Sequence, residues 1–369
     1  MRPRGRPARP AALRLLAAAV VTLLVPLAAC SVVGTGSTED SDGSDGGTGS
    51  SGGTVVVATH DSWAMSKQVL AEFTERTGYR LRVQPGGDAG QLTNRLVLTK
   101  GSPIADLVYG IDTTFASRAV DEGVLADYTA RGQARSAAAY APRDPKQAAQ
   151  LTPIDFGDVC VNVDDVWFRE HRLAPPRTLD DLVDPAYRDL FVTPGANSSS
   201  PGLAFLLATI AKYDDDWPAY WGRLMANGAK VTAGWSDAYE VDFTASGGDR
   251  PIVLSYASSP PFTVPEGAER PTTSSLPATC FRQVEYAGVV AGARNPAGAR
   301  AFLDFMTHRS FQAALPEQMY VFPVDRGAPL PPAWARFATV APRPLTVPSA
   351  DIAANRDDWL REWADITSG

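Results

Sequence analysis

Hydrophobic and polar positions follow two alternating periods from Thr54 onward. Short β-branched runs predict strands, and apolar residues at helical spacing predict the helices between them. Asp88 is placed to cap the second helix, and Gly101 follows its end. The alternation predicts a mostly parallel sheet with helices on both faces. The expected strands are 54–59, 79–87 and 105–114, and the expected helices are 65–78, 88–101 and 115–125.

The same alternation continues to the end of the chain. It predicts a strand at 156–168, a helix at 178–188, a strand, loop and helix within 189–213, a helix at 216–228, a buried strand at 252–254, a strand at 280–293, a helix at 295–315, a short strand at 320–324 and a helix at 349–368. In such α/β sheets, ligands bind beyond the carboxyl ends of strands. A site is therefore expected in the strand-end loops.

The first thirty residues differ from this pattern. A basic stretch precedes the apolar run 15–28, which has the length of a signal-peptide core and is short for a membrane span. The run ends in "LAAC", which resembles a bacterial lipobox. We therefore expect a signal peptide at 1–29 and lipidation of Cys30. The alternative is an ordinary signal peptide with a chance cysteine.

The stretch 30–53 is rich in Ser, Gly and Asp and almost lacks apolar residues after Val33. Such a composition cannot bury a core, so it predicts a flexible tether. Together these features predict an exported protein that is lipid-anchored to the outer face of the cell membrane. We expect a monomer.

The size and charge of the remaining chain limit its class. A body of about 300 residues is long for one core, so two lobes are expected. The net charge is −7 and no basic stripe is present. Nucleic acid is therefore not an expected partner.

Two cysteines, Cys160 and Cys280, lie in strand-like segments. In an exported protein, two cysteines are more often paired than free, which predicts a disulfide between them. The alternative is two buried thiols. No metal site is expected, because the chain has three histidines and neither of these cysteines has CxxC spacing.

Motifs for catalysis are missing from the sequence. Beyond the Gly/Ser-rich stretch 30–53, it contains no GxSxG elbow, HExxH or P-loop. Among the histidines, only His60 is followed by a candidate partner, Asp61. We therefore expect a protein that is not an enzyme, and a hydrolase that uses His60 and Asp61 is the alternative.

Aromatic and small polar residues gather in four strand-end loops. Rings there suit a flat or cationic organic ligand, because a cation over a ring face gains about 0.5–2 kcal/mol. Core packing is the alternative for Trp63, Tyr239 and Phe322. The four groups are His60, Asp61 and Trp63; Trp235 and Tyr239; Tyr256, Ser258, Ser259 and Phe262; and Tyr320 and Phe322.

The segment "ANSSSPGLAFLL" has the features of a helix start. Ser200 is a suitable N-cap, Pro201 suits the first helical position, and Gly202 lets a ligand approach the backbone. Free N–H groups and serine hydroxyls at a helix start bind anions. The segment therefore predicts an anion site, and an ordinary cap is the alternative.

Seven motifs in order resemble one family. They are "THDSW", "GDAGQLTNRL", "ADLVYGIDTT", "SSSPGLAFLL", "VTAGWSDAYEVDF", "VLSYASSPPF" and "FQAALPEQMYVFPV". From about Thr54 to the C-terminal "WLREW", the chain resembles the thiamine-binding substrate-binding proteins of ABC importers. The resemblance implies an α/β, type II periplasmic-binding fold, with mixed sheets flanked by helices and a ligand cleft between two lobes. The expected division is 54–155 and 286–369 with the C-terminal helix for lobe 1, and 156–285 for lobe 2.

The resemblance also implies a set of ligand-binding residues. By motif position these are Asp88, Ala89, Ser199, Ser200, Trp235, Tyr256, Ala257, Ser258, Ser259 and Pro260. Phe262 stands where the family can have Tyr, Tyr320 stands for a family Trp, and His60 stands where a Tyr can occur. With Asp61, these complete the expected site.

The implied function is capture of thiamine or its mono- or diphosphate as a transported ligand, without a cofactor, and delivery to an ABC permease. Whether free or phosphorylated thiamine is preferred stays open. A ferric-iron or other small-solute binder of the same fold is the alternative. Related iron binders use adjacent tyrosines, whereas this chain has Ser255-Tyr256-Ala257.

Overall fold

Three parallel strands open the described part of the chain. The computed structural model describes residues 52–368, so the expected signal peptide, Cys30 and the tether up to residue 51 lie outside the described residues. Strand β1 (Thr54–Thr59) pairs with β2 (Arg80–Pro85) and β3 (Leu107–Asp112). We call these three strands the first half-sheet.

Helices connect the strands of the first half-sheet, as the periodicity predicts. They are α1 (Lys67–Thr77), α2 (Ala89–Leu98) and α3 (Ala116–Asp121). The Ser66 hydroxyl accepts from the N–H of Val69 at the start of α1, and Gly78 ends that helix with a left-handed φ of 73°. Asp88 caps α2, as expected from its position.

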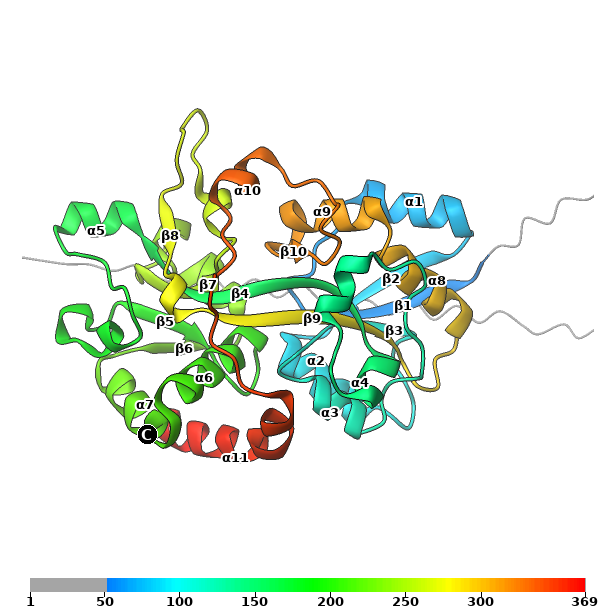
Figure 1. Cartoon of the computed structure of the whole chain (residues 1–369), viewed down its shortest axis with the longest axis horizontal. Coiled ribbons are helices and arrows are strands. Elements are labelled where there is room, and N and C mark those ends of the chain that lie inside the picture. The colour runs from blue at the N-terminus through cyan, green and yellow to red at the C-terminus, as the bar shows by residue number, and fades with distance from the viewer. Residues whose placement is uncertain (1–51, 369) are drawn as a thin grey trace, which may run out of the picture. The chain divides into compact units, whose positions relative to one another are not determined.

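Two long strands cross the middle of the sheet (Figure 1). Strand β9 (Phe281–Val289) runs antiparallel to both β3 and β4 (Thr152–Asp164). The sheet is therefore mixed, and the prediction of a mostly parallel sheet is wrong outside the two half-sheets. The expected lobe boundaries, at 155–156 and 285–286, fall within these two strands.

The second half-sheet lies beyond β4. It consists of β5 (Phe191–Pro194), β6 (Lys230–Thr232) and β7 (Ile252–Tyr256), where β5 is parallel to both neighbours. Strands β8 (Thr273–Ser275) and β10 (Phe322–Pro323) also pair with β4. The order is β2-β1-β3-β9-β4-β7-β5-β6, one continuous sheet of ten strands in the described residues.

Helices flank both half-sheets (Figure 1). Three predicted segments are corrected. Segment 295–315 is two helices, because His308 caps the second. The strand predicted at 156–168 ends at Asp164, whose carboxylate accepts from two N–H groups of a following helix. The helix predicted at 178–188 is two 3₁₀ turns, because Pro185 starts a second turn.

The remaining helices are α4 (Pro145–Gln150), α5 (Asp165–His171), α6 (Ser200–Tyr213), α7 (Trp217–Ala226), α8 (Pro296–Met306), α9 (Arg309–Met319), α10 (Pro332–Phe337) and α11 (Ser349–Ser368).

The ends of the crossing strands are linked covalently. Cys160 on β4 and Cys280, next to β9, form the predicted disulfide. Asp158 accepts two hydrogen bonds from the Arg282 guanidinium, at 2.7 and 2.8 Å, beside this link. No helix within residues 52–368 is long and apolar enough to cross a membrane.

Candidate functional site

A pocket lies between the loops of the two half-sheets. Its walls come from the loops after β1 and β2, the start of α6, the loop after β6, the ends of β7 and α9, and the middle of β9. Its lining includes His60, Asp88, Ser200, Trp235, Glu240, Tyr256, Glu285 and Tyr320. The pocket holds about 610 Å³ of space free of protein atoms, part of it open solvent. The strand-end position agrees with the expectation from the fold class.

Three aromatic side chains, Trp235, Tyr256 and Tyr320, line one wall of this pocket, and Tyr239 supports Trp235. Trp235 stacks on Tyr239 with ring centroids 5.0 Å apart and contacts the edge of Tyr320 at 5.4 Å. Tyr256, at the end of β7, is tilted toward Trp235 at 6.3 Å. The Trp235 indole N–H donates to the Ser255 hydroxyl at 2.9 Å. These contacts fix the indole, so its orientation does not have to be set when a ligand arrives.

Serine hydroxyls hold this wall from behind. The hydroxyls of Ser255 and Ser259 are hydrogen bonded at 2.8 Å, and Ser259 also accepts from the N–H of Tyr256. Ser258 donates to the carbonyl oxygen of Tyr320. Ser258 and Ser259 thus position aromatic residues of the pocket.

Phe262 lies behind Tyr320. The two rings stack at 3.5 Å, and Phe262 lines a neighbouring hollow together with Tyr239. Tyr320 follows α9 with a left-handed φ of 60°, which turns the chain at this point. The structure therefore places Phe262 as a support for Tyr320.

Two other predicted residues of the same loop also lie away from the pocket. Ala257 packs with Cys160 and Cys280 in a small apolar cluster. Pro260 is buried and starts a 3₁₀ turn. Neither lines the pocket.

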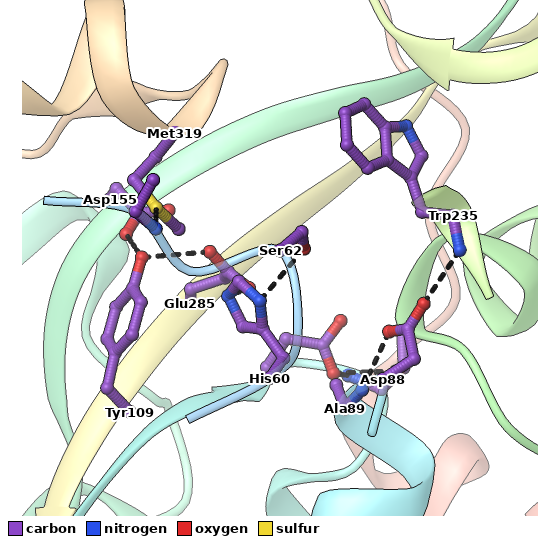
Figure 2. Close-up of polar contacts among 12 residues, drawn as sticks. His60, Ser62, Asp88, Ala89, Tyr109, Asp155, Trp235, Glu285 and Met319 are labelled. Carbon is purple, nitrogen blue, oxygen red and sulfur yellow. Dashed lines mark hydrogen bonds and ion pairs between the residues drawn. The ribbon is translucent and has the colours of Figure 1, made fainter. Parts of the chain in front are cut away.

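Asp88 links the two half-sheets (Figure 2). Its Oδ1 accepts from the N–H of Ala89 at 2.6 Å, and its Oδ2 accepts from the backbone N–H of Trp235 at 3.0 Å. The N–H of Gly90 donates to the carbonyl of Ser198 at 3.1 Å nearby. Ala89 is buried behind Asp88. A hydrogen bond between the Asp88 carboxylate and the Trp235 backbone therefore joins the two sides of the pocket.

His60 and Asp61 face different partners. The Nδ1 of His60 is hydrogen bonded to the Ser62 hydroxyl at 2.9 Å, and its Nε2 lies 3.5 Å from Glu285 Oε1. Asp61 accepts from the N–H of Gly87 at 2.8 Å and lines an adjoining hollow. Gly110, at φ 103°, leaves room for the His60 ring, since an added Cβ would meet that ring.

The start of α6 presents two buried hydroxyls. Those of Ser199 and Ser200 have no hydrogen-bond partner of good geometry, and Ser200 lines the pocket. The Ser200 hydroxyl lies beside the carboxyl group of Asp112. Burial raises the pKa of Asp112 to about 6, against the hydrogen bonds from Thr114, Ser200 and nearby N–H groups that lower it. A carboxyl group of the chain itself therefore already lies beside the predicted anion site.

Sequence reasoning missed a buried acidic cluster beneath the pocket (Figure 2). Tyr109 Oη is hydrogen bonded to Asp155 Oδ2 at 2.5 Å and to Glu285 Oε2 at 3.1 Å. Burial raises the pKa of Asp155 to about 7. Burial and then the neighbouring Asp155 raise the pKa of Glu285 well above its ordinary range. One available signal was a charged residue in a strand that is otherwise buried, as Glu285 is in β9.

Other pocket residues were also missed. Glu240 stands at an exposed position of the lining, and Met319 accepts a contact from the N–H of Ala64 through its sulfur at 3.0 Å. Ser62 and Gln318 complete this part of the lining. Within residues 52–368, no group of three or more His, Cys, Asp or Glu side chains is arranged to hold a metal ion.

Comparison with known proteins gives this arrangement a family. Residues 102–355 match the model of a family described as bacterial extracellular solute-binding protein. The chain belongs to this family. It is 32% identical over 333 residues to the thiamine-binding periplasmic protein of Brucella suis, and the alignment covers 85% of this chain and 92% of that protein. The sequence resemblance to the thiamine-binding family is therefore confirmed.

Similar solved structures confirm the fold. A periplasmic thiamin-binding protein matches with a TM-score of 0.74 and 29% identity over 86% of this chain and 96% of its own. A ferric binding protein from Campylobacter jejuni matches with a TM-score of 0.66, covering 85% and 99% of the two chains, but at 15% identity it shares the fold alone. The type II, two-lobe α/β fold is confirmed, and the protein is an extracytoplasmic solute-binding protein.

Proposed function

We propose that this solute-binding protein captures thiamine in the pocket between its two half-sheets and delivers it to an ABC importer. The observation that carries the proposal is that the fixed aromatic wall of Trp235, Tyr256 and Tyr320 lines the same pocket as the acidic side chains of Asp88 and Glu285. Thiamine offers the matching chemistry, a permanent thiazolium cation joined to a flat aminopyrimidine. The relatives named for thiamine binding support the same ligand.

Different residues of the pocket bind different parts of the ligand. Rings attract a cation through their negative faces, and a buried carboxylate attracts it more strongly because little water screens the charge. The Ser200 hydroxyl lines the pocket beside Asp112 and can accept from the hydroxyl of the ligand's ethyl arm. No group in this set acts as a nucleophile in our proposal, and the ligand leaves unchanged.

Delivery requires the protein to stay near its transporter. Lipidation of Cys30 and a tether over residues 30–53 hold the body at the outer face of the membrane in our proposal. Closing of the two lobes around thiamine presents one shape to the permease, a hinge motion common in binding proteins of this type. The crossing strands β4 and β9 form the hinge, with 54–155 and 286–348 on one side and 156–285 on the other, and α11 contacts both sides.

Calorimetry on the purified protein tests the ligand. Thiamine should release heat with a stoichiometry of one per chain, and it should raise the melting temperature. Mass spectrometry of ligand released from the freshly purified protein should identify the thiazolium compound. The absence of any heat or melting shift with thiamine and both of its phosphates would sink the proposal.

The anchor has its own test. A Cys30→Ala variant, expressed in a bacterium that lipidates exported proteins, should lose the lipid mass and leave the membrane fraction. Its affinity for thiamine should equal that of the wild type, because Cys30 lies far from the pocket in the sequence. Equal membrane retention of both proteins would argue for an ordinary signal peptide.

A further inference from the structure

Glu285 is a carboxyl group placed where a ligand can reach it from one side only. It lies in the middle of β9, is 5% exposed and lines the pocket. The titratable groups that face it come from four elements: His60 after β1, Tyr109 and Asp112 on β3, Asp155 on β4, and Tyr256 at the end of β7. The carboxyl group therefore has a fixed polar surrounding behind it and the pocket in front.

The surroundings of Glu285 supply little positive charge. The lining of the pocket, among the described residues, contains no Lys or Arg. Only His60 approaches, with its Nε2 3.5 Å from Oε1, and that contact is an ion pair only when the imidazole is protonated. Burial, and then the neighbouring acids Asp155 and Asp112, raise the pKa of Glu285. A charged Glu285 without a cation is thus unfavourable, since desolvation opposes it as well.

We propose that Glu285 is the residue that recognises the positive charge of the ligand, and that the ligand's cation replaces a proton held by the Glu285–Asp155 pair. This inference rests on the proposed function. In the free protein one carboxyl O–H is kept within the pair. When the cation enters, that O–H bond breaks, the electron pair stays on the carboxylate, and the proton passes to solvent buffer. Capture of one thiamine therefore releases about one proton.

Tyr109 and Asp155 are positioning residues in this scheme. The Tyr109 hydroxyl holds both carboxyl groups, at 2.5 and 3.1 Å, and is itself fully buried. It keeps the two acids close enough to share a proton, which is the condition for one of them to stay neutral. Their role differs from that of the aromatic wall, whose rings attract the cation without exchanging a proton.

The experiment measures thiamine binding by calorimetry across a range of pH and in buffers of different ionisation enthalpy. In the window where the pair holds its proton, the association constant should rise about tenfold per pH unit, and the buffer dependence should report about one proton released. A neutral isostere, in which the thiazolium nitrogen is replaced by carbon, should bind more weakly and release no proton. This comparison needs no variant.

Two matched variants locate the effect. Glu285→Gln should lose the pH dependence and bind thiamine at least about tenfold more weakly at the high end of the range, because its amide cannot become charged. Glu240→Gln removes a carboxylate from the exposed rim of the same pocket and should keep the proton release. Glu285→Asp keeps a carboxylate and should keep a pH dependence, and its melting curve checks that changes at this position still fold.

The outcomes separate the two proposals. Thiamine that binds the wild type with no proton release, or with the same release in Glu285→Gln, overturns this inference and leaves the proposed function standing. Equal proton release with the neutral isostere also overturns it. A wild type that does not bind thiamine at all overturns the proposed function, and this inference with it.

Discussion

The backbone N–H of Trp235 donates to Oδ2 of Asp88 at 3.0 Å, across the pocket. Asp88 follows β2 in the first half-sheet, and Trp235 follows β6 in the second. One carboxylate therefore caps a helix on its own side and holds a loop on the other. The same contact positions the indole that forms the aromatic wall.

Replacement of Asp88 by Ala should weaken thiamine binding and favour an open arrangement of the lobes. The change removes a charge-assisted hydrogen bond, which contributes about 1.5–3 kcal/mol. Calorimetry gives the affinity, and small-angle scattering with and without thiamine gives the change in size. Asp61→Ala is the matched control, since Asp61 bonds to Gly87 within the first half-sheet. If both variants lose the same affinity, the hydrogen bond from Asp88 to Trp235 does not explain the loss.

Trp235→Ala should reduce the affinity for thiamine by more than ~1 kcal/mol, about fivefold or more, through loss of the cation–π contact. The affinity of Trp235→Phe should lie between those of the wild type and Trp235→Ala, because phenylalanine keeps a ring face but loses the N–H bond to Ser255. Trp167→Ala serves as the control, because Trp167 stacks on His171 on α5 and is not a lining residue of the pocket. An unchanged affinity in Trp235→Ala would contradict a stacking role.

The alternation of strands and helices was readable from sequence because each half-sheet is built from local βα units. The period of the apolar residues and the cap at Asp88 carried that information. The antiparallel pairing of β4 and β9 joins residues more than a hundred positions apart. No local pattern specifies such a pairing, so the mixed sheet was predicted only through the family resemblance.

The site divides in the same way. Motif positions pointed to Asp88, Ser200, Trp235 and Tyr256, all of which line the pocket. They did not reveal that Ala257 packs on the disulfide, because the direction of a side chain after β7 depends on what covers the loop. Glu285 was missed for a related reason: in the sequence it is one acidic residue in an alternating strand, and only the fold surrounds it with other acids.

Loss of the disulfide should destabilise the fold without removing the pocket. The link spans 120 residues of sequence, and cross-links that close long loops usually stabilise by about 2–5 kcal/mol. Urea denaturation of a Cys160→Ser/Cys280→Ser double variant should show this loss, while thiamine affinity changes little. Wild type in a reducing agent should match the variant. Equal stability of all three samples would exclude a structural role for the link.

The stability of the ligand-free protein should fall as the pH rises from about 4 to about 7. Burial raises the folded-state pKa of Asp112 to about 6 and of Asp155 to about 7, above their ordinary value of 3.8. Between the ordinary and the raised values, the folded state holds more protons than the unfolded state, so raising the pH favours unfolding. Denaturant titrations across this range measure the slope.

Asp155→Asn should flatten this slope, because an amide does not titrate. Asp181→Asn is the control, since hydrogen bonds from the N–H groups of Arg177 and Thr178 lower the pKa of Asp181. The stability that Asp181 provides is lost only as the pH falls through its lowered pKa, below this range. A wild type whose stability rises steadily with pH would contradict the prediction.

Helix α11 contacts α7, which packs on α6, and it also contacts α3, which packs on β3 of the first half-sheet. Between α11 and α7, the rings of Trp363 and Trp221 meet edge to face with centroids 5.6 Å apart. Between α11 and α3, the Asp357 carboxylate lies 4.0 Å from the Arg118 guanidinium. The first contact is buried and the second is near solvent. A hinge motion that leaves α11 on α7 must therefore change the spacing at Arg118. An environment-sensitive dye at position 357 would turn this helix into the readout of a thiamine biosensor, with the signal generated far from the pocket.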